Sequence, residues 1–352
     1  MASWPESWPD ADGELAGEGT KMAGYEPVPL PTGAADASRA ELVAGLTGWV
    51  CSRPVRDLVA AFGGELPDHL WPAGLLAWLD HFSAAHWDFR QRHGTVERDE
   101  VVETRFPDAT AELVRSAATA LGLIGSRPAP ARRYDHLLVL GGLARSSLQR
   151  TAYAAHLVGT GAVVVGEVAA LGSFRPLRPA ETAELDLPGC GYEVDAMDLG
   201  IRAAFGYAAP AVRRSSDGEI THRSWSVRSY RPPSGPVVHV LAAPSTEPAT
   251  RRAHTSDTYH FWAGQVGPVA GDRVLVLTSQ LYVPFQHCDA IRTLGLGYGC
   301  EVHTIGLDPA RLTEPGPTQR WGPDQYLQEL RSAVRSMGNL LAALNRPSAA
   351  PA

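Results

Sequence analysis

The feature that most constrains the fold of this chain is a pair of segments in which a short apolar run leads directly into a polar turn and then a helical pattern. The first segment is His136–Arg150, with a Gly-Gly turn, and the second is Arg273–Gly295, with a Thr-Ser-Gln turn. Such apolar runs are typical of parallel strands covered on both faces. The carboxyl ends of parallel strands meet at one edge of an open sheet, where ligands bind. The sequence therefore indicates where a ligand binds more clearly than it indicates a reaction.

Alternating strand and helix patterns predict the fold class: an α/β protein with a Rossmann-like open parallel sheet and flanking helices. The predicted strands are Leu137–Leu140, Ala162–Val165, Val237–Leu241, Arg273–Leu277 and Glu301–Ile305. The predicted helices are Ser146–Val158, Val194–Phe205, Ala253–Val266, Pro284–Leu294 and Asp324–Leu344. We expect the last helix to pack on the sheet. The loosely alternating segment Gly218–Tyr230 is compatible with an added hairpin or strand.

An α-helical N-terminal region is predicted before the sheet. Residues 1–36 are rich in Pro, Gly, Ala and acidic residues, so we expect a disordered tail there. Helical periodicity then predicts two short helices in Ser38–Phe62, one over Pro72–His93 and one over Ala109–Leu123. The expected domains are this helical region, 37–125, and a Rossmann-like domain, 132–345, followed by a tail at 346–352.

Composition argues against several classes of protein. The net charge of −7 is unlike that of a nucleic-acid or membrane-surface binder, which needs a basic face. The chain has no apolar run near the roughly 20 residues that span a bilayer, and its N-terminus lacks the pattern of a signal peptide, so we expect a cytoplasmic protein. Lys21 is the only lysine, which argues against Schiff-base, P-loop and kinase chemistry. Cysteine and histidine spacings predict no metal site.

Candidate ligand-binding residues follow the predicted strand ends and open the predicted helices. The glycines let the backbone approach a ligand, arginines add charge-assisted hydrogen bonds, and hydroxyl and amide groups add further contacts. The set is Gly141, Gly142, Arg145, Arg150, Glu167, Arg252, His254, Thr278, Ser279, Gln280, Tyr282 and Gln286. The alternative interpretation is a simple turn for the glycines, solvent exposure for the arginines and helix capping for the hydroxyls.

Two acidic residues are the candidates for catalysis. Glu193 follows the long segment Val168–Tyr192 and opens a helix, and Asp257 opens another. Either carboxyl group is suited to general acid–base chemistry, although an acid at a helix start also interacts favourably with the helix dipole without catalysing anything. The sequence contains neither a Gly-x-Ser-x-Gly nucleophile elbow nor a Gly-x-Gly-x-x-Gly dinucleotide motif at these strands. We therefore expect hydrolytic or group-transfer chemistry rather than redox chemistry.

The order of these motifs resembles that of the YdcF-like (DUF218) family, which includes SanA and ElyC. The resemblance covers about residues 134–306. The matching elements are Val139-Leu-Gly-Gly142 with Arg150, Glu193-Val-Asp-Ala-Met197, Asp257-Thr258-Tyr259 and Thr278-Ser279-Gln-Leu-Tyr282. The chain departs from the family pattern at Glu167, Asp257, Val283 and Gln286. The resemblance implies a Rossmann-like fold with a crevice for a nucleotide-like or S-adenosylmethionine-like ligand, without an envelope role.

Together these observations predict a soluble enzyme that binds a small anionic or nucleotide-like metabolite at the strand ends. The partner is a small molecule, and neither a nucleic acid nor a membrane is expected as a partner. The alternative is a non-catalytic ligand sensor or a protein-interaction scaffold that uses the same crevice or the N-terminal helices. The sequence does not distinguish these two functions.

Overall fold

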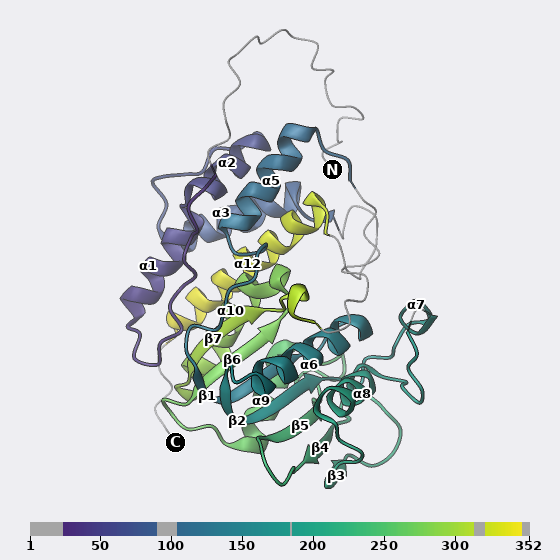
Figure 1. Ribbon diagram of the computed structural model, residues 1–352. Coiled ribbons are helices and arrows are strands. Elements are labelled where there is room, and N and C mark those ends of the chain that lie inside the picture. The colour runs from purple at the N-terminus through teal and green to yellow at the C-terminus, as the bar shows by residue number, and fades with distance from the viewer. Residues whose placement is uncertain (1–23, 90–103, 184, 313–320, 347–352) are drawn as a thin grey trace.

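A computed structural model describes residues 24–89, 104–183, 185–312 and 321–346, and in it one seven-stranded sheet carries helices on both faces (Figure 1). In spatial order the strands are β3 (Val212–Ser215), β4 (Ser226–Tyr230), β5 (Val237–Ala242), β2 (Val164–Gly172), β1 (Arg133–Leu140), β6 (Arg273–Thr278) and β7 (Glu301–Gly306). The last five of these run parallel, and the edge strands β3 and β4 are antiparallel. This architecture confirms the predicted α/β class.

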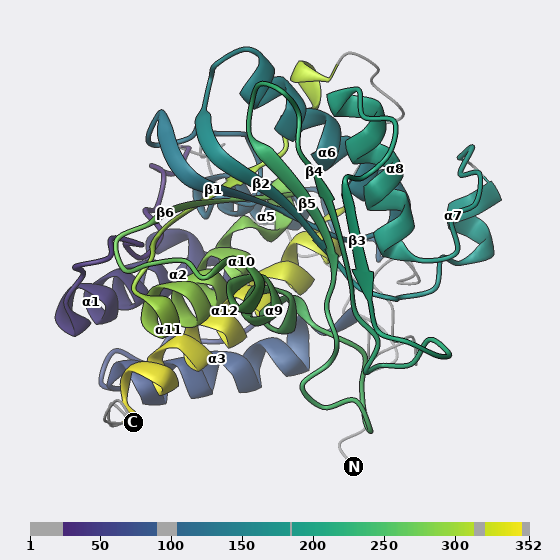
Figure 2. The same ribbon diagram turned by 90° about the horizontal axis from the view of Figure 1, so that it is seen from below.

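The helices form two groups. The N-terminal helices are α1 (Arg39–Val50), α2 (Arg53–Ala61), α3 (Pro72–His86) and α5 (Asp108–Ala120). The helices that follow are α6 (Ala144–Gly159), α7 (Pro179–Ala183), α8 (Glu193–Phe205), α9 (Thr255–Val266), α10 (Val283–Ala290), α11 (Leu296–Tyr298) and α12 (Pro323–Leu344). Helices α6 and α8 cover one face of the sheet, and α9 and α10 cover the other (Figure 2). None of the helices in the described ranges combines the length and apolar character needed to cross a bilayer.

Strand β2 differs from its prediction. The strand was expected to end at Val165, but it continues to Gly172, because the apolar run Val168–Leu171 pairs with β1 and β5. Glu167 was expected to lie at the polar end of this strand. Its side chain instead lies inside a polar cluster at the amino-terminal half of the sheet, where Trp262 Nε1 donates to Glu167 Oε1 at 3.1 Å. A charged residue is tolerated within a strand when it is hydrogen-bonded in this way.

The edge of the sheet beyond β5 was only partly predicted. Strand β4 lies within the segment 218–230, for which an added hairpin or strand was considered. Strand β3 was not predicted, because its residues Val212–Ser215 are all exposed and show no alternation of buried and exposed positions. Arginines on an exposed edge strand discourage pairing with other chains.

The N-terminal helices share one hydrophobic core with one face of the sheet. Buried side chains of α1 and α3, such as Trp49 and Leu79, belong to the same cluster as Val276 of β6 and Met337 of α12. Helix α12 packs against α10, α3 and α5, so the expectation that it lies on the sheet is wrong. The reason is that α9 and α10 already cover that face, and α12 forms the next layer (Figures 1 and 2).

The described part of the predicted N-terminal tail is ordered by backbone contacts. Val28 N donates to Ala120 O at 2.8 Å, and Val302 N donates to Gly33 O at 2.7 Å. These contacts join the segment to the end of α5 and to β7. Because they are made by backbone atoms, no periodic pattern in the sequence predicts them. Residues 1–23 of the predicted tail, residues 347–352 of the C-terminal tail, and the predicted helical residues 90–93 lie outside the described residues.

A histidine between two carboxylates lies in the amino-terminal half of the sheet. His136 of β1 has Nδ1 3.1 Å from Glu167 Oε1 and Nε2 3.1 Å from Asp272 Oδ2. Burial lowers the pKa of His136, but the hydrogen bonds and charges of Glu167 and Asp272 outweigh burial, so that the pKa is raised above its ordinary value of 6.5. His136 therefore links β1, β2 and the turn before β6.

We predict that this link makes stability depend on pH. A histidine with a raised pKa stabilises the folded state below its unfolded pKa, and that stabilisation is lost as the pH rises through the folded pKa. Replacing His136→Gln should therefore cost on the order of 1–2 kcal/mol at about pH 6 and less at about pH 9. Urea denaturation of both proteins at the two pH values measures this, and a cost that is independent of pH would contradict the prediction.

Candidate functional site

A cavity of about 590 Å³ opens at the carboxyl ends of the parallel strands. Its volume is in the range of small-molecule sites. Its walls come from the ends of β1, β2 and β6, the starts of α8 and α9, and one face each of α10 and α12. Of the residues predicted from sequence, those that line it are Gly141, Gly142, Arg150, Glu193, Arg252, His254, Thr278, Tyr282 and Gln286.

Arg150 lines this cavity and joins the ends of β1 and β6. Its Nη1 donates to Leu140 O at 2.8 Å and to Gly141 O at 2.5 Å, and its Nη2 donates to Ser279 Oγ at 2.9 Å. The chain leaves β1 toward β2 on one side and leaves β6 toward β7 on the other, so these neighbouring strands form the topological switch point of the sheet. The side chain is only 2% exposed, so Arg150 holds both strand ends in place and adds positive charge to the cavity wall.

Glu193 lies at the start of α8 with its carboxylate against the end of β1. Its Oε2 accepts hydrogen bonds from Ser173 Oγ at 2.7 Å and from Ser173 N at 3.1 Å. A Cβ at Gly141 would lie 2.6 Å from Glu193 Oε1, so the absence of a side chain at Gly141 makes room for this carboxylate. Burial raises the pKa of Glu193, although Arg175, Ser173 and Arg252 act in the opposite direction. Glu193 therefore keeps its proton to a higher pH than an exposed glutamate.

The segment between β2 and α8 is anchored by an ion pair. Arg175 Nη1 and Nη2 lie 2.7 and 2.9 Å from the two carboxylate oxygens of Glu181, and Nη2 also donates to Gly142 O at 2.8 Å. Glu181 in turn accepts from Ala144 N at the start of α6. Burial raises the pKa of Glu181, but Arg175 and the backbone N–H groups lower it to about 2. Part of the segment Val168–Tyr192 is thereby fixed beside the Gly-Gly turn.

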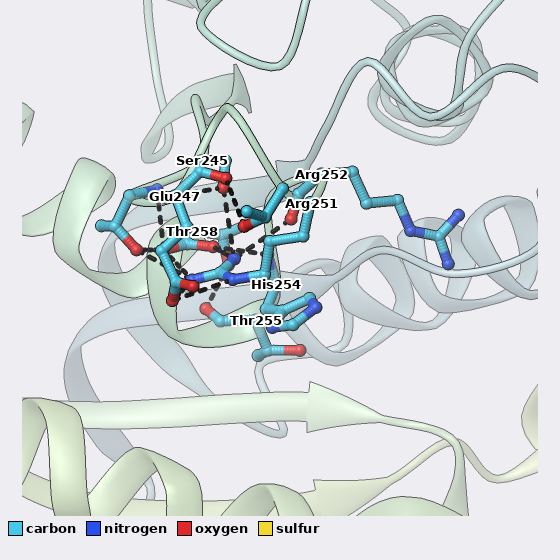
Figure 3. Close-up of polar contacts among 10 residues, drawn as sticks. Ser245, Glu247, Arg251, Arg252, His254, Thr255 and Thr258 are labelled. Carbon is cyan, nitrogen blue, oxygen red and sulfur yellow. Dashed lines mark hydrogen bonds and ion pairs between the residues drawn. The ribbon is translucent and has the colours of Figure 1, made fainter.

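The start of α9 places Arg252 and Asp257 in different surroundings. Asp257 accepts from His254 N at 2.7 Å and from Thr246 Oγ1 at 2.6 Å, and its Oδ2 lies 2.5 Å from Arg251 Nη1. Burial raises the pKa of Asp257, but these bonds lower it to about 2. Arg252 points away from this network (Figure 3) and lines the cavity. Asp257 is therefore buried in the capping box of α9 and is not among the residues that line the cavity.

Four further candidates from the sequence analysis are not on the cavity wall. Ser279 accepts from Arg150, and Gln280 Nε2 donates to Gly122 O at 2.7 Å, which ties the sheet to the end of the N-terminal helical region. Glu167 lies in the cluster around His136, because β2 continues beyond it. Arg145 is in the first turn of α6 but is not among the residues that line the cavity.

Sequence reasoning identified only Gln286 on the wall formed by α10 and missed the wall formed by α12. Asp289 and Arg292 of α10 and its π-helical extension line the cavity, as do Arg335, Ser336 and Asn339 of α12. Ser336 Oγ donates to Asp289 Oδ1 at 3.1 Å, and burial raises the pKa of Asp289 despite its pairing with Arg292. The available signal was the spacing of Tyr282, Gln286 and Asp289, which puts three polar side chains on one helical face.

The described residues contain no group of three His, Cys, Asp or Glu side chains arranged to hold a metal ion. The cavity instead contains cationic side chains in excess. Its arginines are Arg150, Arg175, Arg252, Arg292 and Arg335, and its carboxylates are Glu193 and Asp289. This excess of arginine is opposite in sign to the chain's net charge of −7.

Comparison with known proteins identifies relatives of the whole chain. Residues 33–122 match the family model described as the Rv3785 N-terminal domain. Relatives described as the uncharacterized proteins Rv3785 of Mycobacterium tuberculosis and Mb3814 of Mycobacterium bovis are each 32% identical over 341 residues, which cover 90% of this chain and 93% of the relative. No solved structure matches the chain.

These matches overturn the resemblance to the YdcF-like family, because the family they identify is a different one. The motifs that carried the resemblance were short strand ends and helix starts. Such patterns arise wherever a parallel strand runs into a helix, so they reflect the class of fold more than descent. The family model, in contrast, matches the helical N-terminal region, which the resemblance left out.

We predict that removing the guanidinium of Arg150 destabilises the protein. The Arg150→Met variant would leave Leu140 O, Gly141 O and Ser279 without a buried donor, so we expect a loss of about 2–4 kcal/mol in the free energy of unfolding. Chemical denaturation measures this. Arg213→Ala, on the exposed strand β3, is the control and should change stability by less than about 0.5 kcal/mol. Equal stability of Arg150→Met and the wild type would contradict the assignment.

Proposed function

The chain belongs to the Rv3785 family, and we propose that it is an enzyme that binds a small anionic metabolite in the cavity at the strand ends and catalyses a hydrolytic or group-transfer reaction on it. The observation that carries this proposal is the meeting of Arg175, Arg252 and Glu193 in one cavity. These residues come from three separate parts of the chain: the segment after β2, the loop before α9 and the start of α8. Both Nη atoms of Arg175 are already bonded to Glu181, so Arg252 is the guanidinium on which binding of an anion mainly depends, and Glu193 is the buried acid beside it.

The charge of the cavity supports an anionic ligand. Guanidinium groups bind phosphate and carboxylate through paired hydrogen bonds. The starts of α8 and α9 also border the cavity, and a helix N-terminus favours negative charge. A cavity lined with cationic groups on an acidic protein concentrates anions locally. We therefore expect a phosphate or carboxylate group of the ligand to lie near Arg252, because the Nη atoms of Arg175 already bond to Glu181 and Gly142 O.

Glu193 is the proposed general acid or base. Its burial and raised pKa are typical of carboxyl groups that exchange protons near neutral pH. The two hydrogen bonds from Ser173 hold one carboxylate oxygen, while Oε1 faces the Gly141 turn. In hydrolysis or group transfer, this group would donate a proton to the leaving oxygen or accept one from the attacking nucleophile.

A second candidate function is a non-catalytic ligand sensor. The observation that favours it is that Glu193 already accepts two hydrogen bonds from Ser173, which also explains its position in purely structural terms. A sensor would bind the same anion without turning it over. The two functions therefore differ in the effect of Glu193 on turnover rather than in ligand binding.

We predict that Arg252→Ala weakens anion binding. Loss of a charge-assisted contact should lower the affinity for inorganic phosphate or a phosphate monoester by about tenfold, which corresponds to about 1.4 kcal/mol. Isothermal titration calorimetry measures the affinity. Arg213→Ala removes the same charge on β3 and should leave binding unchanged. If both variants bind like the wild type, the anion does not lie near Arg252.

We predict that Glu193→Gln separates binding from catalysis. The wild type should bind the anion more tightly as the pH falls toward the pKa of Glu193, which lies above 4.5, because protonation removes a negative charge beside the ligand. The Gln variant should lose this pH dependence and bind about tenfold more tightly at neutral pH. In a screen of phosphate esters, its turnover should fall by a factor of about 10²–10⁴. Intact binding with no turnover by the wild type would instead favour the sensor.

A further inference from the structure

One wall of the cavity contains a buried glutamine whose amide oxygen accepts no hydrogen bond from the described residues. Gln286 of α10 is 6% exposed and lines the cavity, and its Nε2 donates to Thr255 Oγ1 at 3.4 Å. Its Oε1 has no hydrogen-bond partner among the residues that the structure describes. A buried polar atom left in this state is costly, and in native proteins such an atom usually has a partner in water or a ligand. The unpaired amide oxygen of Gln286 therefore indicates a ligand that donates a hydrogen bond to it.

A second acceptor lies one turn further along the same helix. Asp289 lines the cavity, and its carboxylate accepts from Ser336 Oγ at 3.1 Å and lies 3.4 Å from Arg292 Nη2. Residues three apart on a helix share one face, so Gln286 and Asp289 present their acceptors side by side. The remaining cation on this side, Arg335, has its Nε 3.9 Å from Asp80 Oδ1. Among these side chains, the two acceptors favour a ligand group that donates hydrogen bonds.

Aromatic rings complete this wall. Tyr282, Phe285 and Trp321 line the same cavity. The ring centroids of Tyr282 and Phe285 are 6.5 Å apart, those of Tyr282 and Trp321 are 6.2 Å apart, and both pairs are edge-on. The guanidinium carbon of Arg150 also lies 5.9 Å from the centroid of the Tyr282 ring, and aromatic rings of this kind pack well against a planar aromatic ligand. Acceptors and aromatic rings together are the surroundings that a nucleobase with an amino group requires.

We propose that this wall, Gln286 and Asp289 with Tyr282, Phe285 and Trp321, is a binding site for a nucleobase that carries an exocyclic amino group, as adenine does. The inference rests on the proposed function: the base would occupy this wall while the phosphate of the same nucleotide lies near Arg252. The two sides adjoin within one cavity: Arg252 precedes α9, and Thr255 at the start of α9 accepts from Gln286 Nε2 at 3.4 Å.

The test compares ligands that differ at one position. Calorimetric titration of the full chain with AMP, IMP and ribose 5-phosphate separates recognition of the base from recognition of the phosphate, because IMP carries an oxo group where AMP carries the amino group. We expect AMP to bind at least about tenfold more tightly than IMP, the ratio expected when a buried acceptor loses its donor. Ribose 5-phosphate should bind measurably but more weakly than AMP.

Variants at Gln286 assign the preference to this wall. Gln286→Leu should bring the affinity for AMP down to that for IMP and leave ribose 5-phosphate binding unchanged. Gln286→Glu keeps an acceptor of the same length and should retain the preference for AMP, which tests the assignment even if the Leu variant does not fold. The control is Gln265→Leu on α9, where the amide oxygen accepts from Arg214 outside the cavity; it should behave like the wild type.

The possible results separate the two proposals. If ribose 5-phosphate binds but AMP is not preferred over IMP, or IMP is preferred, the nucleobase site is overturned and the anion site stands. If neither ribose 5-phosphate nor AMP binds, both proposals are overturned. If the preference for AMP survives Gln286→Leu, the base is recognised elsewhere and the assignment to α10 is wrong.

Discussion

The site depends on the hydrogen bonds that the guanidinium of Arg150 donates to two strand ends. Parallel strands end in backbone carbonyls, and at the switch point between β1 and β6 the chain turns away in opposite directions. Arg150 reaches from α6 to donate to two carbonyls at the end of β1 and to Ser279 after β6. A single planar, permanently charged group therefore sets the spacing of both strand ends. The positions of the Gly-Gly turn and of Thr278, which line the cavity, follow from that spacing.

A second constraint concerns the space at the Gly-Gly turn. The carboxylate of Glu193 occupies the position that a side chain at Gly141 would need. Ser173 and Arg175, which follow β2, then hold that carboxylate and the neighbouring carbonyl of Gly142. One acid is thereby kept buried among arginines, and its pKa is raised by burial while the arginines limit the increase. An acid and a cationic surface within one cavity are the chemical basis of the proposed reaction.

The N-terminal helices contribute to the site through the core rather than through the chemistry. They pack around α12, and α12 packs against α10. These last two helices form the wall with Gln286, Asp289 and Ser336. The matched family domain at residues 33–122 therefore supports the helix that closes the cavity. A change in the N-terminal core is transmitted to this wall by direct packing.

The sequence by itself determined the α/β class, the ends of β1 and β6, and the helix start at Glu193, because apolar runs and cap residues are local signals and parallel pairing brings strand ends to one edge. It also pointed to nine residues that line the cavity. Only the tertiary structure decided that Asp257 caps a helix while Arg252 lines the cavity, that Glu167 lies inside β2, and that α12 forms one wall. Those outcomes depend on which distant side chain meets each group, and such partners leave no periodic signal along the chain.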